Sequence, residues 1–164
     1  MLIPLKRYVP FTWHLLFLVL LLFPDLHFSQ SLSTSFTDQS SWLPIRGFSG
    51  APIGIADMNG DKKDDLVFIR NRNTLVVQTQ DANSQGFSVY DQQGIGSTMW
   101  SVCVGDFDQN GRNDILTGGA FTNIRLYNGN VSGTPYTGSV LANSDIFLQG
   151  SNFVDIDNDG WLDV

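Results

Sequence analysis

One feature limits the fold of this chain more than any other: a short acidic pattern that occurs three times at one interval. The copies read DMNGDKKDD from Asp57, DFDQNGRND from Asp106 and DIDNDGWLD from Asp155, so each begins 49 residues after the last (57 to 106, then 106 to 155). Similarity at a constant interval is the signature of a structural repeat. It extends beyond the acidic segments, because TLVVQ (74–78) aligns with NIRLY (123–127). We therefore expect a chain of repeated units.

Within one period the pattern predicts four short strands. In the second period they are expected at 101–105, 114–120, 123–129 and near 138–142, with the acidic segment between the first two. NRN (71–73) and NGN (128–130) are suited to hairpin turns or strand ends. Four antiparallel strands per period are typical of one β-propeller blade. The predicted fold is all-β, with residues 42–164 forming two to three blades of a partial propeller.

The N-terminal segment is expected to be a signal peptide. Lys6 and Arg7 precede the apolar run 13–23, and small residues follow near Ser29. The run is shorter than the ~20 residues that a membrane-spanning helix needs. We therefore assign 1–29 to the signal peptide and 30–41 to a polar lead-in. The mature chain is expected to be secreted or at the cell surface, with no membrane span.

Oxygen-bearing side chains occur at the first, third, fifth and ninth positions of each acidic loop. The seventh residue would add its backbone carbonyl, which explains why its side chain varies. The predicted ligands are Asp57, Asn59, Asp61, Lys63 and Asp65 in loop 1 (57–65), Asp106, Asp108, Asn110, Arg112 and Asp114 in loop 2 (106–114), and Asp155, Asp157, Asp159, Trp161 and Asp163 in loop 3 (155–163).

This donor set favours calcium. Hard oxygen ligands without nitrogen or sulfur suit Ca²⁺, and Mg²⁺ less well, so we expect roughly two to three Ca²⁺ ions per chain. Asp and Asn in ordinary turns would explain one such loop but not three clusters of mutually repelling carboxylates at one interval. A helix–loop–helix calcium site is excluded because the chain has no Glu for its twelfth position and strands follow the loops.

These loops resemble the calcium-binding repeats of the FG-GAP/VCBS family, which form integrin-α-like propellers. FSGAP (48–52) is similar to the motif that names the family, with Ser49 where glycine is usual. The resemblance covers residues 42–164 and implies the ligands given above. One position departs from it: the sixth residue is Gly111 or Gly160 in the later loops but Lys62 in loop 1. A left-handed turn there would disfavour loop 1 by ~1 kcal/mol, unless Gly60 changes how the loop turns.

The residue inventory leaves two classes of function. The resemblance implies an extracellular module that binds a protein or glycan ligand. The alternative is the propeller part of a polysaccharide-degrading enzyme, such as a lyase. Without the leader the chain has no His, no Glu and one thiol, Cys103, expected to be buried and inert, which disfavours catalysis. The acidity is concentrated in the loops and gives no support for nucleic-acid binding.

Two further expectations concern the tryptophans and the extent of the chain. Trp42, Trp100 and Trp161 are expected in the core, with stacking on a sugar as the alternative. The third loop is followed by only one residue, and a closed propeller needs about four to eight blades. We therefore expect this sequence to be a piece of a longer protein that, expressed as residues 30–164, would self-associate or be partly ordered.

Overall fold

The structure is a computed structural model that describes residues 37–47, 52–83, 85–130, 135–143 and 147–164. The expected signal peptide, most of the lead-in and residues 48–51 of the FSGAP motif lie outside the described residues. The chain divides into two units, residues 1–37 and 38–164, and the second holds every element described below.

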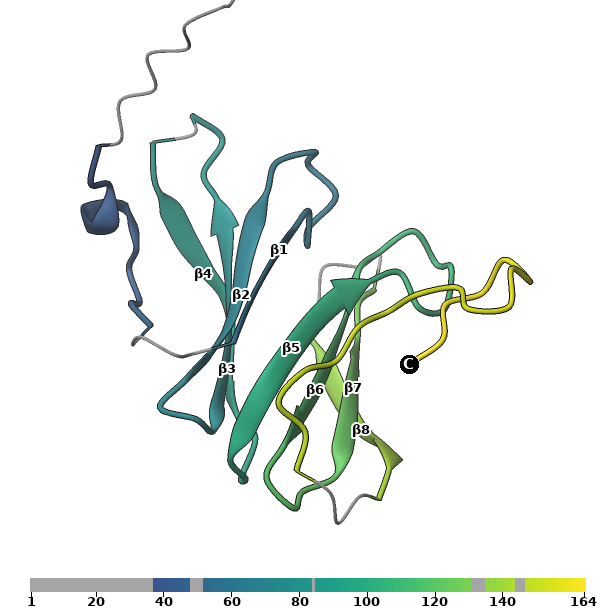
Figure 1. The fold of residues 1–164 in the computed structure, drawn as a ribbon. Coiled ribbons are helices and arrows are strands. Elements are labelled where there is room, and N and C mark those ends of the chain that lie inside the picture. The colour runs from purple at the N-terminus through teal and green to yellow at the C-terminus, as the bar shows by residue number, and fades with distance from the viewer. Residues whose placement is uncertain (1–36, 48–51, 84, 131–134, 144–146) are drawn as a thin grey trace, which may run out of the picture. The chain divides into compact units, whose positions relative to one another are not determined.

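The second unit contains two antiparallel sheets of four strands, each in simple sequence order (Figure 1). The strands of the first sheet are β1 (Ile53–Ala56), β2 (Asp65–Arg70), β3 (Thr74–Gln80) and β4 (Phe87–Gly94). Those of the second are β5 (Met99–Gly105), β6 (Asp114–Gly119), β7 (Ile124–Asn128) and β8 (Thr137–Ala142). The all-β prediction of four-stranded, blade-like sheets is confirmed, and the sheets do not close into a barrel or ring.

Turn chemistry explains the strand ends. Asn71 and Arg72 both have positive φ (52° and 66°) in the three-residue connection between β2 and β3, as the two central residues of a primed β-turn require. The turn is closed by a hydrogen bond from the Asn73 N–H to the Arg70 carbonyl, 3.3 Å. Loop 1 connects β1 to β2, and loop 2 connects β5 to β6.

Loop 3 is closed by a smaller element. Val154 and Asp163, one on each side of the turn, form an isolated antiparallel bridge. Each donates its N–H to the carbonyl of the other, at 3.2 and 2.7 Å. All three acidic loops therefore leave and return through paired extended backbone.

The hydrophobic core draws on both sheets. Successive side chains of a strand point to opposite faces, so alternate residues of β2 and β3 meet residues of the second sheet. The cluster consists of Met58, Val67, Ile69, Leu75, Val77, Ile95, Met99, Ile115, Tyr127 and Tyr136. Truncating a fully buried member such as Ile115 to Ala would cost about 2–5 kcal/mol. One shared core therefore fixes the two sheets, and with them loops 1 and 2.

The segment before β1 contains a short helical turn. A 3-10 helix spans Ser40–Trp42, an element that the sequence pattern does not predict. Further along, Ile45 exchanges two hydrogen bonds with the side chain of Gln78, at 3.0 and 2.8 Å, which explains how this fully buried amide is satisfied. The part of the chain that the structure describes includes no helix long and apolar enough to cross a membrane.

The tryptophan prediction is wrong in one clear case. Trp161, at the seventh position of loop 3, is 53% exposed. Trp42 and Trp100 are half-buried and do not belong to the core cluster.

Candidate functional site: three acidic loops

The first aspartate of each loop collects the backbone N–H groups of the turn. In loop 2, Oδ1 of Asp106 accepts from the Asn110 N–H at 2.9 Å and Oδ2 accepts from the Gly111 N–H at 2.8 Å. Asp155 makes the equivalent bonds to the N–H groups of Asp159 and Gly160, at 3.1 and 2.9 Å. The loop is thus wound around one carboxylate.

Asp57 does the same in loop 1, where the hydrogen bonds change its acidity. Burial pushes the pKa of Asp57 upward, but the N–H groups of four loop residues together outweigh it and lower the pKa below the ordinary value. These residues are Lys62, Gly60, Asp61 and Asn59. The carboxylate therefore stays ionised in the folded chain.

The third and fifth side chains form shorter links within the loop. Asn59 and Asp108 each accept from the N–H two residues later, at 2.8 and 3.2 Å. The fifth residues accept from the N–H of the seventh: Asp61 from Lys63 at 2.9 Å, Asn110 from Arg112 at 2.8 Å and Asp159 from Trp161 at 2.8 Å. These bonds turn alternate side-chain oxygens toward the inside of each loop.

The ninth aspartate connects the loop to the sheet. Asp65 is fully buried, and its two oxygens accept from the N–H groups of Met58 and Gln80, both at 2.8 Å. Asp114, also fully buried, accepts in the same way from Phe107 at 2.9 Å and Gly129 at 2.7 Å. Burial raises the pKa of both carboxyl groups, and their backbone hydrogen bonds only partly offset it.

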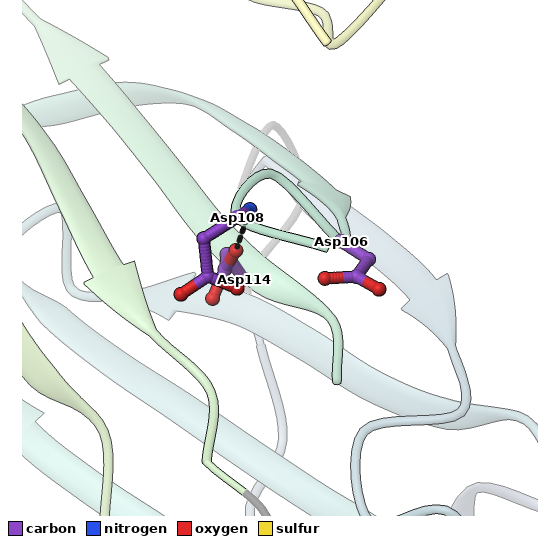
Figure 2. A group of neighbouring side chains, drawn as sticks. All are labelled: Asp106, Asp108 and Asp114. Atoms are coloured by element: carbon purple, nitrogen blue, oxygen red, sulfur yellow. Dashed lines mark hydrogen bonds between the residues drawn. The ribbon is translucent and has the colours of Figure 1, made fainter. Parts of the chain in front are cut away.

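The carboxylates gather in two of the loops. In loop 2, oxygens of Asp106, Asp108 and Asp114 lie within 4.8 Å of one another, as they do for Asp155, Asp157 and Asp159 in loop 3. Figure 2 shows the side chains of Asp108 and Asp114 close together, with Asp106 across the turn. No such group of three carboxylates occurs in loop 1, all of whose residues the structure describes.

All three loops share one backbone path with two left-handed residues each. The fourth and sixth residues have positive φ in every loop: Gly60 and Lys62, Gln109 and Gly111, Asn158 and Gly160. Lys62 is left-handed (φ 68°), as its alignment with Gly111 and Gly160 predicts, but loop 1 does not turn differently from the others. Each loop places one glycine and one larger residue at these positions, so backbone strain does not single out loop 1.

The seventh residue of loop 1 directs its side chain away from the loop. Nζ of Lys63 donates to the carbonyls of Asp81 and Ala82, at 2.9 and 2.6 Å, in the connection between β3 and β4. The Lys63 ammonium group is thereby held outside loop 1. The backbone carbonyl of Lys63 is then the group that this residue could offer as a ligand.

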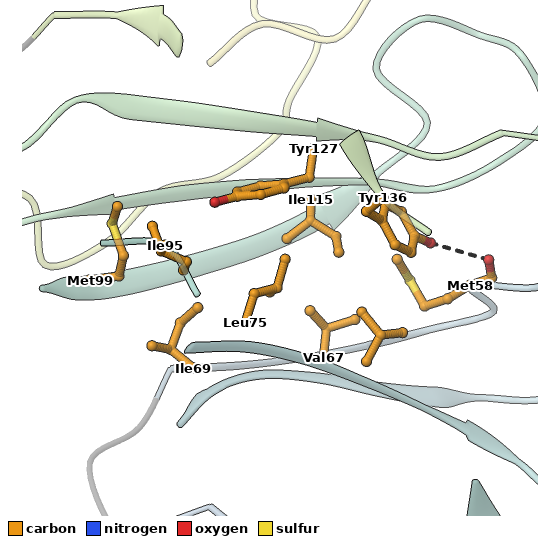
Figure 3. Close-up of a cluster of buried hydrophobic side chains, with 10 residues drawn as sticks. Met58, Val67, Ile69, Leu75, Ile95, Met99, Ile115, Tyr127 and Tyr136 are labelled. Atoms are coloured by element: carbon orange, nitrogen blue, oxygen red, sulfur yellow. Dashed lines mark hydrogen bonds between the residues drawn. The ribbon is translucent and has the colours of Figure 1, made fainter. Parts of the chain in front are cut away.

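Contacts between the loops were not predicted. The hydroxyl group of Tyr136 lies 3.2 Å from the carbonyl oxygen of Met58 in loop 1 (Figure 3). It also lies 3.4 Å from the carbonyl oxygen of Asn113 in loop 2. Burial raises the pKa of Tyr136 well above its usual range, so the hydroxyl remains a donor. The 49-residue alignment pairs this residue with Phe87, and only the added hydroxyl group hinted at a polar role.

Cys103 lies in β5 and is half-buried. Burial raises the pKa of its thiol, which disfavours the thiolate needed for nucleophilic chemistry. The prediction of an inert thiol agrees with this environment, although the side chain is less buried than expected.

The arrangement fits a hard divalent cation. Its donors are carboxylate, amide and carbonyl oxygens on a single turn, and the loop N–H groups already hold the carboxylates in place. Ca²⁺ prefers such oxygen ligands, accepts a flexible geometry and tolerates a mixture of carboxylates and carbonyls. Loops 2 and 3, with gathered carboxylates, fit it best.

Comparison with known proteins gives one match. Residues 57–117 match a family model described as an FG-GAP-like repeat. The matched segment begins at loop 1, includes β2 to β5 and loop 2, and ends in β6. The expected resemblance is confirmed for this segment, although it was predicted to extend over 42–164. Neither a curated protein nor a solved structure matches the chain significantly.

Proposed function

We propose that this chain, a β-propeller-type module with an FG-GAP-like repeat at residues 57–117, is an extracellular calcium-binding module that presents a surface to a protein or glycan ligand. The observation that carries the calcium proposal is the threefold loop, in which the same positions turn oxygens inward through the same hydrogen bonds. Repulsion among gathered carboxylates is a cost that a bound cation would remove. Calcium would serve here as a structural ion that fixes the loops on the sheets.

The residues that would hold the ion follow from the loop positions. The side chains at positions one, three, five and nine and the backbone carbonyl at position seven would supply the ligands. Since the ninth aspartate also accepts two N–H groups of the sheet, an ion bound there would be linked directly to the fold. We expect roughly two to three Ca²⁺ ions per chain.

Calorimetric titration of EDTA-stripped protein tests this proposal. Ca²⁺ should bind, with Mg²⁺ much weaker, and should raise the melting temperature. At a Ca²⁺ concentration 100-fold above Kd, each site should add about 2.7 kcal/mol to the free energy of unfolding. Asp61→Ala should remove most of the loop 1 contribution, whereas the matched control Asp64→Ala, at an exposed non-ligand position in that loop, should retain it. Absence of both heat and stabilisation in the unmodified protein would refute calcium binding.

Exposed aromatic side chains support the ligand-binding part of the proposal. Phe121 is 72% exposed and Phe147 is 47% exposed, and their ring centroids are 6.3 Å apart. Phe147 also contacts Trp100 at 6.0 Å, and the guanidinium group of Arg72 lies 5.1 Å from the Trp100 ring centroid. Arg72 and Phe121 lie in the β2–β3 and β6–β7 turns, at the strand ends remote from the acidic loops.

Phe121 also has a left-handed backbone (φ 53°), an uncommon conformation for a bulky residue that is typical of functional turns. Aromatic rings and arginine are enriched in binding surfaces. A glycan array probed with the calcium-loaded chain should give signals that Phe121→Ala abolishes. An unchanged binding pattern in that variant would place the ligand elsewhere.

The proposed extracellular location depends on the signal-like order of residues 1–29 in the sequence. It agrees with a function that uses calcium at the millimolar concentrations at which extracellular modules bind it.

A further inference from the structure

Loop 2 contacts loop 1 through side chains that are not ligands in loop 2. Asn113, at the eighth position, donates from Nδ2 to the backbone carbonyl of Asp57 at 2.9 Å. The guanidinium group of Arg112 packs on Gly60, where a Cβ atom would overlap with Nη1. Loop 2 therefore touches the residue that organises loop 1 and a left-handed position between two of its ligands.

Loop 2 also contacts loop 3, through a residue on its other side. Gln109, at the fourth position, donates from Nε2 to the backbone carbonyl of Gly160 at 2.5 Å. Gly160 is the left-handed residue between Asp159 and Trp161, and its own N–H is bound by Asp155. A change in the backbone of loop 3 at this point would move three of its candidate ligands.

The position of the glycine in each loop agrees with these contacts. Loop 1 has its glycine at the fourth position, where Arg112 needs the space. Loop 2 instead has Gln109 at this position, and that side chain reaches loop 3. Glycine is thus at the fourth position in loop 1 and at the sixth in loop 2, and both loops keep the same left-handed positions. This placement makes room for Arg112 against loop 1 and lets Gln109 reach loop 3.

We propose that loop 2 couples the three metal sites. An ion bound in loop 2 favours binding in loop 1 through Asn113 and binding in loop 3 through Gln109. This inference rests on the proposed calcium function. Both side chains flank ligand residues of loop 2, so an ion that orders loop 2 fixes their Cα positions. Each then holds a neighbouring loop by its backbone, which reduces the ordering cost of the next ion. Tyr136, which lies between the carbonyls of Met58 and Asn113, reinforces the first connection.

Loop 3 offers a direct readout of this coupling. Trp161 lies at its seventh position, where loops 1 and 2 have Lys63 and Arg112, so Tb³⁺ bound in loop 3 should be sensitised by the indole. Trp161→Phe identifies that signal. Loss of the loop 2 site by Asp106→Asn should raise the Tb³⁺ concentration for half-saturation of loop 3 by at least about fivefold, the lower end of typical coupling between sites.

Variants without ligand changes separate coupling from folding. Gln109→Ala should reproduce the shift in loop 3, whereas Asn113→Ala should not. Both residues belong to loop 2 and neither side chain is a candidate ligand, but Gln109 contacts loop 3 and Asn113 contacts loop 1. An unchanged half-saturation in both Asp106→Asn and Gln109→Ala would overturn the coupling to loop 3. Absence of Tb³⁺ and Ca²⁺ binding in the unmodified chain would instead overturn the proposed function.

Coupling to loop 1 can be measured by hydrogen exchange. In Ca²⁺, amide protection of residues 57–65 should fall in Asn113→Ala while protection of residues 106–114 is retained. The control is Asp64→Ala, the eighth residue of loop 1, which is exposed. Equal protection of loop 1 in Asn113→Ala and the unmodified chain would contradict this part of the proposal.

Discussion

At the scale of single residues, the ninth aspartate has a structural role and, under the proposed function, a second role as a metal ligand that requires a different property of its carboxyl group. Asp65 satisfies two buried backbone N–H groups, one in its own loop and one at the end of β3. The candidate metal site needs the same carboxyl group to be ionised, although burial raises its pKa. A bound cation would favour the ionised form and so reconcile the two roles.

This dual role predicts a large effect of a small substitution. Asp65→Asn replaces one acceptor oxygen with an NH₂ group, so a buried N–H of Met58 or Gln80 would face another donor. We expect it to lower the free energy of unfolding by about 1–3 kcal/mol in EDTA, where no metal contributes. Urea unfolding checks the value. The neighbouring exposed Asp64→Asn should change it by no more than about 0.5 kcal/mol, and equal effects of the two substitutions would contradict the structural role.

At the scale of elements, the three loops share one frame but differ in charge. Loop 3 has four carboxylates at ligand positions, and loops 1 and 2 have three each. Loop 1 also lacks the close group of three carboxylates found in the others. Since their left-handed residues are matched, ligand charge and placement are the differences that remain, and we expect loop 3 to bind Ca²⁺ most tightly and loop 1 most weakly.

The ranking of calcium affinities can be measured by comparing how much each substitution reduces the calcium-dependent rise in melting temperature. Asp155→Ala should remove more of the calcium-dependent rise in melting temperature than Asp57→Ala. Comparison of each variant in Ca²⁺ and in EDTA cancels the loss of backbone hydrogen bonds, which occurs under both conditions. A larger loss of the calcium-dependent part in Asp57→Ala would reverse the order.

Much of this architecture could be predicted from the sequence because each loop is local. A run of nine residues contains both its own ligands and the N–H groups that bind them, and the strands that follow show clear apolar segments. The contacts of Gln109, Asn113 and Tyr136 could not be predicted, because they join segments that are distant in the chain. The pairing of Ile45 with Gln78 could not be predicted for the same reason. The sequence shows a polar residue in a strand but not its hydrogen-bond partner 33 positions away.

At the scale of the whole molecule, equivalent residues of the two repeats differ in their packing: those of β5 contact a neighbouring strand, whereas those of β1 are exposed. Val102 and Val104 of β5 pack against Gly54 of β1, at 3.4 and 3.1 Å from where its Cβ would lie. Their counterparts 49 residues earlier are Ile53 and Ile55, which are 58% and 60% exposed. In repeat architectures the contacts between neighbouring units supply much of the stability. The exposed face of β1 has the character of such a contact surface.

The concentration of acidic residues in the loops has a consequence for colloidal behaviour. The chain has a net charge of −7, and mutual repulsion between like-charged molecules opposes precipitation. Divalent cations bound in the loops would cancel most of that charge while leaving Ile53, Ile55 and Trp161 exposed. An ion that stabilised the fold would thus also reduce the repulsion that keeps copies of the chain apart. Stability and solubility would respond to calcium in opposite directions, and the protein would be easiest to handle between the two extremes of calcium concentration.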